Sequence, residues 1–320
     1  MKVILDSIKP VIQNSKHIHI NSGAIIDFSK IVVQKDLEGS EYTKETFAEN
    51  TSEEEHIAYG VVYNSLNFFY WGEPKWTVII DGENFDGSSG MHKALNRAIK
   101  QGFPILDSNF LSKLSEKDFQ TILAGNVEIP FFKERLNLLR DLGKIVSDKF
   151  SGSFTNIIKK GNGDAVEIVK VLVTDFLSVF NDVADYHGHE VKFYKRAQLV
   201  PAHLFDLKKL DLISINLTGY GELTAFADYK VPQLLRKFKI LEYSEDLANR
   251  IDKKIEIPAG SDEEIEIRAN TIWAVELVAR QLKSRFPQAN AAKVDGIFWF
   301  KGQVKSPDDK PYHRTRTIWY

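Results

Sequence analysis

The spacing of apolar residues along the chain predicts a mainly α-helical protein. In many segments these residues recur every three to four positions, which places them on one face of a helix. Helices are predicted within residues 1–35, at 91–101, 108–123, 165–186 and 262–286, and in a long segment opened by Pro130. Residues 76–81 have the β-branched composition of a short strand. We expect a compact multi-helix fold with a few short strands, forming one domain over 1–320 with helical lobes at roughly 1–150 and 151–320.

One stretch, residues 217–241, combines a glycine turn, an apolar run and an isolated acid. The turn at 219–221 has two glycines, which let the backbone take a positive φ or approach another group closely. The apolar run that follows ends at Asp228, and Pro232 is well placed to open a second, amphipathic helix. Asp228 therefore lies at a helix entrance among apolar neighbours. From the residues alone it is either a helix cap or a working acid.

Four consecutive aromatic residues, 68–71, form a second candidate feature. They cannot all point into one core face, so some of them should line a cavity or a groove. Asn67 precedes them in apolar surroundings, and a buried amide must find a hydrogen-bond partner. It either ties backbone groups together or faces a ligand. An aromatic core layer explains the same run without any site.

Composition narrows the function mainly by exclusion. The 320 residues are 43% hydrophobic and 27% charged, as in a soluble globular protein. A net charge of −2 provides no electrostatic footprint for long nucleic acid or an anionic membrane. The absence of cysteine excludes disulfides, thiolate-bound metals and a thiol nucleophile. Without an apolar run of membrane-spanning length or a signal peptide, we expect a cytoplasmic monomer.

The known catalytic sequence signatures are missing as well. No serine–histidine–acid order, kinase signature or dinucleotide fingerprint is present. His187 and His189 could bind a metal, but no third ligand lies nearby in the sequence, and a turn at a helix end is the preferred interpretation. We therefore expect neither a metal nor a cofactor.

One acid, aromatic walls and a few cations suit the cleavage of an N-glycosidic bond. A carboxylate near the anomeric carbon can stabilise an oxocarbenium-like transition state, activate water or form a transient covalent bond. Aromatic side chains can hold a planar base, and lysine or arginine can hold a sugar phosphate. The residues alone leave open a glycosylase that acts on a flipped base in DNA or RNA, and a non-catalytic nucleotide-binding protein.

The segment 217–241 consists of the glycine turn, the apolar run read as a helix, Asp228 and the amphipathic helix after it. In this order these features resemble the helix-hairpin-helix DNA glycosylases. In that family the acid matching Asp228 carries the chemistry. The chain departs from the family at Glu222, whose charge would repel a DNA phosphate, and it lacks the cluster-binding cysteines that many members carry.

Six ordered motifs cover most of the chain: YNSLNFFYW (63–71), FSGSF (150–154), FYKRAQL (193–199), GELTAFADYKVPQ (221–233), EIEIRANTIWAVELV (264–278) and PYHRTRTIWY (311–320). Together they resemble the queuosine salvage protein family. The resemblance implies a largely helical fold with a helix-hairpin-helix glycosylase-like portion. It also implies hydrolysis of queuosine 5′-monophosphate, which frees the 7-deazaguanine base queuine for reuse in tRNA modification. One departure is Pro201-Ala202-His203, where the family tends to have an acid before the aromatic residue.

The resemblance also assigns roles to residues. It makes Asp228 the catalytic carboxylate, and leaves open whether it acts as nucleophile, general base or electrostatic stabiliser. The residues expected around the substrate are Asn67, Phe68, Trp71 and Glu73 at the base, Tyr229 beside the acid, and Lys195, Arg196, Lys230, Arg314 and Arg316 as candidates for the phosphate. A structural salt bridge explains each cation equally well. His313 could lie near the sugar or pack the C-terminal tail.

Overall fold

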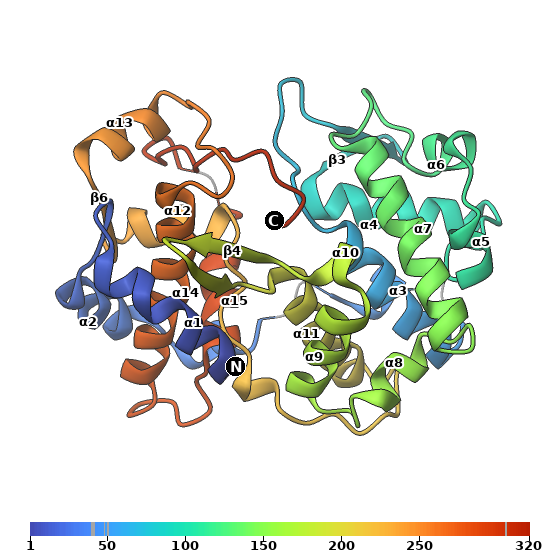
Figure 1. Ribbon diagram of the computed structural model, residues 1–320, viewed down its shortest axis with the longest axis horizontal. Helices are drawn as coiled ribbons and strands as arrows, with labels where there is room; N and C mark the ends of the chain where they lie inside the picture. The colour runs from blue at the N-terminus through green and yellow to red at the C-terminus, as the bar shows by residue number, and fades with distance from the viewer. Residues whose placement is uncertain (40–41, 48, 50, 305) are drawn as a thin grey trace.

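The computed structural model describes residues 1–39, 42–47, 49, 51–304 and 306–320, and this part of the chain is mainly helical (Figure 1). The α-helices are α1 (Lys2–Asn14), α2 (Ser22–Ile31), α3 (Glu53–Leu66), α4 (Gly87–Lys100), α5 (Ser108–Ser112), α6 (Glu116–Ile122), α7 (Phe132–Lys149), α8 (Thr155–Lys160), α9 (Ala165–Asp175), α10 (Leu177–Phe180), α11 (Lys195–Lys209), α12 (Lys230–Lys237), α13 (Glu245–Asp252), α14 (Asp262–Leu282) and α15 (Ala291–Lys301). Three 3-10 turns, η1 (Gln34–Leu37), η2 (Lys44–Phe47) and η3 (Tyr220–Glu222), complete the helical elements. The mainly α fold predicted from the sequence is confirmed.

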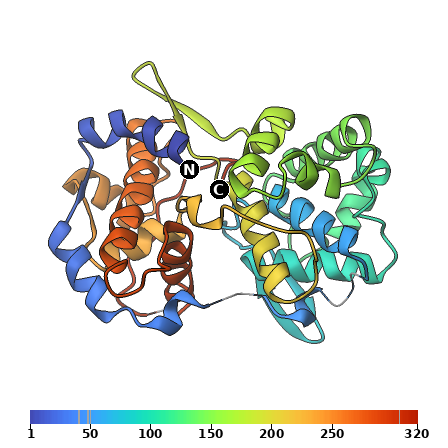
Figure 2. The ribbon, with the colours of Figure 1, turned by 90° about the horizontal axis from the view of Figure 1, so that it is seen from below.

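The strands are few and short. They form three antiparallel pairs: β1 (Ile18–Ile20) with β6 (Leu241–Tyr243), β2 (Thr77–Ile80) with β3 (Glu83–Asp86), and β4 (Val183–Tyr186) with β5 (His189–Lys192). The strand predicted at 76–81 is therefore confirmed as β2. The β4–β5 hairpin packs against α1 and α14, and its tip projects beyond the helices in Figure 2.

The helices gather into two groups that lie side by side (Figures 1 and 2). In one group α14 contacts α1, α2, α12 and α15, and in the other α3 contacts α4, α7, α8 and α11. The N-terminal helices thus pack against helices from the last third of the chain. The division into one domain with lobes at 1–150 and 151–320 stays a prediction. No helix in the described ranges is long and apolar enough to cross a membrane.

Two predicted helices are wrong in extent. The segment 165–186 contains α9, α10 and the strand β4, because Phe176 leaves the helical conformation at φ −116° and ψ 53°. The turn at His187 joins β4 to β5, so it is a hairpin turn and does not end a helix. The segment 108–123 is divided into α5 and α6 because the Ser115 hydroxyl accepts a hydrogen bond from the Asp118 N–H and starts a new helix.

The apolar run that follows the glycine turn is also not a helix, contrary to the prediction. Residues 223–227 are irregular, and side chains satisfy backbone groups that a helix would pair internally. The N–H of Thr224 donates to Gln198 Oε1 at 2.9 Å, and the N–H of Phe226 donates to Asp295 Oδ1 at 2.9 Å. This segment is therefore fixed from two sides by α11 and α15, and it leads directly to Asp228.

Buried arginines fix the C-terminal end of the central helix α3. Arg135 donates to the carbonyl oxygens of Leu66, Phe68 and Phe69, and Arg196 donates to those of Ser65 and Val179. The last carbonyls of a helix lack internal partners and carry partial negative charge, which favours cations there. These contacts set the path of residues 67–71 and thereby position Asn67.

Candidate active site

Two adjoining cavities lie where the two groups of helices meet. Cavity A has a volume of about 160 Å³ and cavity B of about 520 Å³. Six residues line both and so form the passage between them: Asn67, Ser88, Lys195, Asp228, Trp299 and Phe300. From this passage cavity A continues toward His203, Asp206 and Asp295, and cavity B toward Phe68, Tyr229 and Lys230.

Asp228 lies at this passage and also caps a helix. Its Oδ1 accepts hydrogen bonds from the N–H groups of Lys230 at 2.7 Å and Val231 at 3.0 Å, in the first turn of α12. Two oxygens give a carboxylate more acceptor sites than these two bonds use. Asp228 is therefore a helix cap whose side chain also lines a cavity, and its role as a working acid stays a prediction.

A second acid, Asp295 on α15, lies in the same cavity and was missed in the sequence. It is buried, and it accepts the Phe226 N–H at 2.9 Å. Burial, helped by the nearby Asp228 carboxylate, raises the pKa of Asp295 to about 8, although the Phe226 N–H and Lys195 oppose this shift. Asp295 is therefore neutral at pH 7 and can donate a hydrogen bond or a proton. The sequence does contain one signal for Asp295, because it is an acid inside the apolar helical run 294–300.

Lys195 is a cation that interacts with both acids. It begins α11 and is buried, and its Nζ donates to the carbonyl of Asn67 at 2.9 Å. Burial lowers the pKa of Lys195 to about 8, although the Asp228 carboxylate opposes this shift. The charge of Lys195 therefore depends on Asp228, because a lysine in a low-dielectric site needs a nearby carboxylate to stay protonated.

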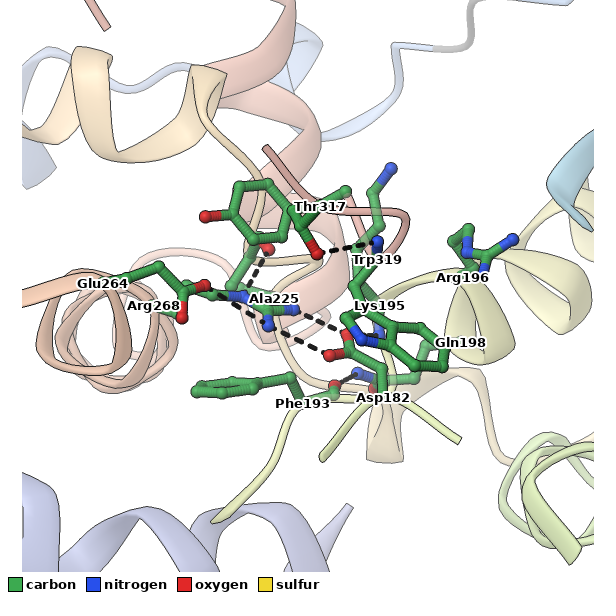
Figure 3. Close-up of polar contacts among 12 residues, drawn as sticks. Asp182, Phe193, Lys195, Arg196, Gln198, Ala225, Glu264, Arg268, Thr317 and Trp319 are labelled. Carbon is green, nitrogen blue, oxygen red and sulfur yellow. Dashed lines mark hydrogen bonds and ion pairs between the residues drawn. The ribbon is translucent and has the colours of Figure 1, made fainter. Parts of the chain in front are cut away.

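A buried ion pair holds the backbone next to both Asp228 and Lys195 (Figure 3). Arg268 on α14 binds Asp182 through two parallel bonds of 2.9 and 2.6 Å, and its Nε donates to the carbonyl of Ala227 at 3.4 Å. Asp182 in turn accepts the backbone N–H of Lys195 at 3.3 Å. One ion pair thus ties the residue before Asp228 to the start of α11.

The structure brings together some of the residues predicted for the site. Those that line the cavities are Asn67, Phe68, Lys195, Asp228, Tyr229 and Lys230. Tyr229 packs against Tyr312 with ring centroids 4.8 Å apart, on the wall of cavity B.

Other predicted residues lie outside the two cavities. Arg196 is buried against backbone carbonyls. Trp71 packs in the core with its ring 4.3 Å from that of Phe69. Glu73 is exposed and pairs with Arg314 at 2.6 Å in a separate surface groove.

Two residues of the C-terminal tail also have packing roles. His313 is buried, and its Nε2 lies 3.2 Å from the hydroxyl of Tyr320. Arg316 is exposed, and its guanidinium lies 5.4 Å from the ring centroid of Phe69. The end of the tail is docked on residues 67–71, because the Phe69 N–H donates to the carbonyl of Tyr320 at 3.0 Å.

No group of three or more His, Asp or Glu side chains suited to a metal is found in the ranges that the structure describes. His187 lies on the exposed hairpin, where its Nε2 is 2.8 Å from Asp262. The described side chains of the two cavities therefore offer general acid, general base and electrostatic chemistry from Asp228, Asp295 and Lys195.

Comparison with known proteins gives a consistent result. Residues 47–320 match the model of the family described as queuosine salvage protein. The chain is 37% identical to the queuosine 5′-phosphate N-glycosylase/hydrolase of Sphaerobacter thermophilus, over 99% of this chain and 97% of that protein. It is 31% identical to the protein of the same name from Mus musculus, over 84% of this chain and 83% of the other. The Bos taurus protein of that name is 28% identical over 98% of both chains.

The Arg268–Asp182 pair should dominate the stability of the site. Replacing Arg268 with Ala leaves a buried carboxylate without its partner, so we expect the free energy of unfolding to fall by about 3–5 kcal/mol. Chemical denaturation followed by circular dichroism measures this loss. Arg250→Ala is the matched control, because its pair with Glu263 is partly exposed and should be worth about 0–1 kcal/mol. Equal losses in the two variants would contradict the central role of the buried pair.

Proposed function

Because this chain belongs to the queuosine salvage protein family, we propose that it hydrolyses queuosine 5′-monophosphate to queuine and ribose 5-phosphate. The observation that carries this proposal is the placement of two carboxyl groups with different environments in one cavity. Asp228 accepts backbone N–H groups, and Asp295 is buried with a raised pKa. An acid that is kept protonated beside a second carboxylate can take a different catalytic role from it.

The proposed reaction divides between these two acids. The bond from the ribose C1′ to the base nitrogen breaks, and its electron pair leaves with the base. Asp228 stabilises the positive charge that develops at C1′, or guides water to it. Neutral Asp295 donates a hydrogen bond or a proton to the departing base. Overall, water supplies the hydroxyl group at C1′ and the proton that the free base retains.

The charges around the two cavities support one orientation of the nucleotide. We place the base in cavity A, where Trp299, Phe300 and Phe226 provide aromatic walls. We place the phosphate in cavity B, where Lys230 lies near the first turn of α4 and its Ser88 and Ser89. The ribose then lies at the passage, next to Asp228. Lys195, which lines both cavities, faces the sugar and the developing charge.

We further propose that the chain acts as a cytoplasmic monomer on the free nucleotide, without long nucleic acid and without a cofactor. The net charge of −2 supports the exclusion of a polyanionic partner. Glu222 in the exposed turn before Asp228 supports it too, because its charge would repel a phosphate backbone. A steep salt dependence of binding to duplex DNA would argue for the nucleic-acid glycosylase instead.

The direct test is the release of free queuine from queuosine 5′-monophosphate in the presence of EDTA, followed by chromatography. We expect rapid release from the monophosphate, slower release from unphosphorylated queuosine because the cations of cavity B have no phosphate to bind, and none from guanosine monophosphate. Absence of release with EDTA and with added metals would contradict hydrolysis and favour a nucleotide-binding protein.

Substitutions of Asp228 separate its capping role from its catalytic role. Asparagine caps a helix about as well as aspartate, whereas alanine costs about 1 kcal/mol of stability. We expect Asp228→Asn to retain the unfolding free energy and nucleotide affinity while kcat falls about 10³-fold. Asp228→Ala should lose the same activity and also the cap. Near-normal turnover by Asp228→Asn would remove this carboxylate from the mechanism.

The raised pKa of Asp295 predicts the pH dependence of the reaction. The pKa of Asp295 is about 8, so Asp295 keeps its proton below pH 8. The rate should therefore be maintained below that pH and fall as the pH rises through it. We expect Asp295→Asn to lower kcat about 10²-fold and to remove this basic limb from a profile of kcat/KM against pH.

Lys195 provides the control for this profile, because burial lowers its pKa to about 8 as well. In Lys195→Arg the cation cannot titrate in this range, so a limb that persists belongs to Asp295. Loss of the limb in Lys195→Arg, or its persistence in Asp295→Asn, would contradict the assignment to Asp295.

A further inference from the structure

A histidine without hydrogen-bond partners lines cavity A away from the six residues of the passage. His203 on α11 is only 2% exposed, and neither of its ring nitrogens has a partner among the described residues. Its ring lies 4.7 Å from that of Tyr42 and 5.3 Å from that of Phe47, and it packs against Gly60 of α3. Buried polar groups are nearly always paired, so two unpaired nitrogens on the wall of a cavity indicate a missing partner.

The protonation state of His203 defines the partner that it needs. Burial, with a smaller contribution from the nearby His56, lowers the pKa of His203 to about 3. The ring is therefore neutral, with one nitrogen that donates and one that accepts. A hydroxyl group matches either nitrogen, because it also donates and accepts. A carboxylate or an ammonium group matches only one of them.

Asp206 lies one helical turn after His203 on α11 and lines the same cavity. Residues three apart on a helix are neighbours on one face. Burial raises the pKa of Asp206, and its ion pair with Lys209 at 2.9 Å opposes that shift and uses only Oδ1. Asp36 adds a second acid, while Lys209 and Lys293 line the cavity as cations. A ligand that brings a positive charge and hydroxyl groups would satisfy this part of the cavity.

Resting on the proposed function, we propose that His203 and Asp206 are specificity-determining residues that recognise the side arm of the base. The arm of queuine carries a secondary ammonium and a cyclopentene ring with two adjacent hydroxyl groups. With the ring system of the base between the aromatic walls, Asp206 pairs with the ammonium and His203 hydrogen-bonds to the hydroxyl groups. Nucleotides that lack the arm leave these two side chains unpaired and are disfavoured.

The test compares three 5′-monophosphates: queuosine, the 7-aminomethyl-7-deazaguanine nucleoside and 7-deazaguanosine. They carry ammonium and diol, ammonium alone, and neither group. We expect the wild-type kcat/KM to fall in this order. His203→Phe, which keeps an aromatic ring, should reduce the preference for queuosine monophosphate over the 7-aminomethyl nucleotide at least tenfold. Asp206→Asn should reduce the preference for the 7-aminomethyl nucleotide over 7-deazaguanosine monophosphate by a similar factor.

Controls separate recognition from folding. Asp141→Asn, an exposed acid on α7, should leave all ratios unchanged. His203→Asn retains a donor and an acceptor and should restore part of the preference for the diol. Thermal denaturation reports whether each variant is folded. Dissociation constants of the three free bases, measured by calorimetry, give the same comparison without turnover.

The outcomes distinguish the two proposals. If the wild-type protein hydrolyses none of the nucleotides and binds none of the bases, the proposed function itself fails. If it hydrolyses queuosine monophosphate and the variants keep the wild-type ratios, His203 and Asp206 do not read the arm and the inference is overturned. Equal losses on all three nucleotides would likewise overturn it, because they would indicate a structural role. The inference is supported if His203→Phe loses the preference for queuosine monophosphate and Asp206→Asn loses the preference for the 7-aminomethyl nucleotide.

Discussion

The organisation of the site depends on one buried ion pair, Arg268 with Asp182. Both side chains are 2% exposed, and Arg268 also stacks on Phe193 and Tyr320, with its guanidinium 3.9 and 4.4 Å from the ring centroids. Two charges in a low-dielectric interior tolerate little displacement, since separating them leaves each charge desolvated and unpaired. The pair binds the carbonyl of Ala227 and the N–H of Lys195, so the same constraint fixes the backbone on both sides of the passage between the cavities.

Next to this ion pair, two aspartates lie in different environments. Asp228 is half-buried and accepts two backbone N–H groups at the start of α12, where the helix end carries partial positive charge. Asp295 is buried on α15, and desolvation raises its pKa. Because the two groups interact, the negative charge on Asp228 itself helps to keep Asp295 protonated. The protonation of Asp295 thus depends in part on the charge of Asp228.

Local signals predicted part of this site, and tertiary contacts determined the rest. Asp228 could be found from sequence because its position at a helix entrance is a local property. Asp295 was missed although it is an acid inside an apolar helical run, because the run does not show what the acid meets: the Phe226 N–H that it accepts is 69 residues away. The segments 165–186 and 223–227 were predicted as helices because apolar runs fit helix and extended backbone alike. In 223–227, hydrogen bonds to distant side chains hold the irregular backbone, and in 165–186 the helix ends at Phe176. The mainly α fold and the family motifs depend on patterns spread over the whole chain, which explains why they were correctly predicted.

Neighbouring cations in the sequence show why residue type alone does not assign a binding role. Lys195 and Arg196 are consecutive, yet successive helical residues point about 100° apart around the axis. Arg196 therefore reaches the carbonyls at the end of α3, whereas Lys195 binds the carbonyl of Asn67 and also lines both cavities. Arg135 binds the same helix end as Arg196. Arg196 and Arg135 line neither cavity and are unavailable to a ligand there. Lys195 binds the carbonyl of Asn67 and also lines both cavities, so it links the positioning of Asn67 to the charge at the proposed reacting centre.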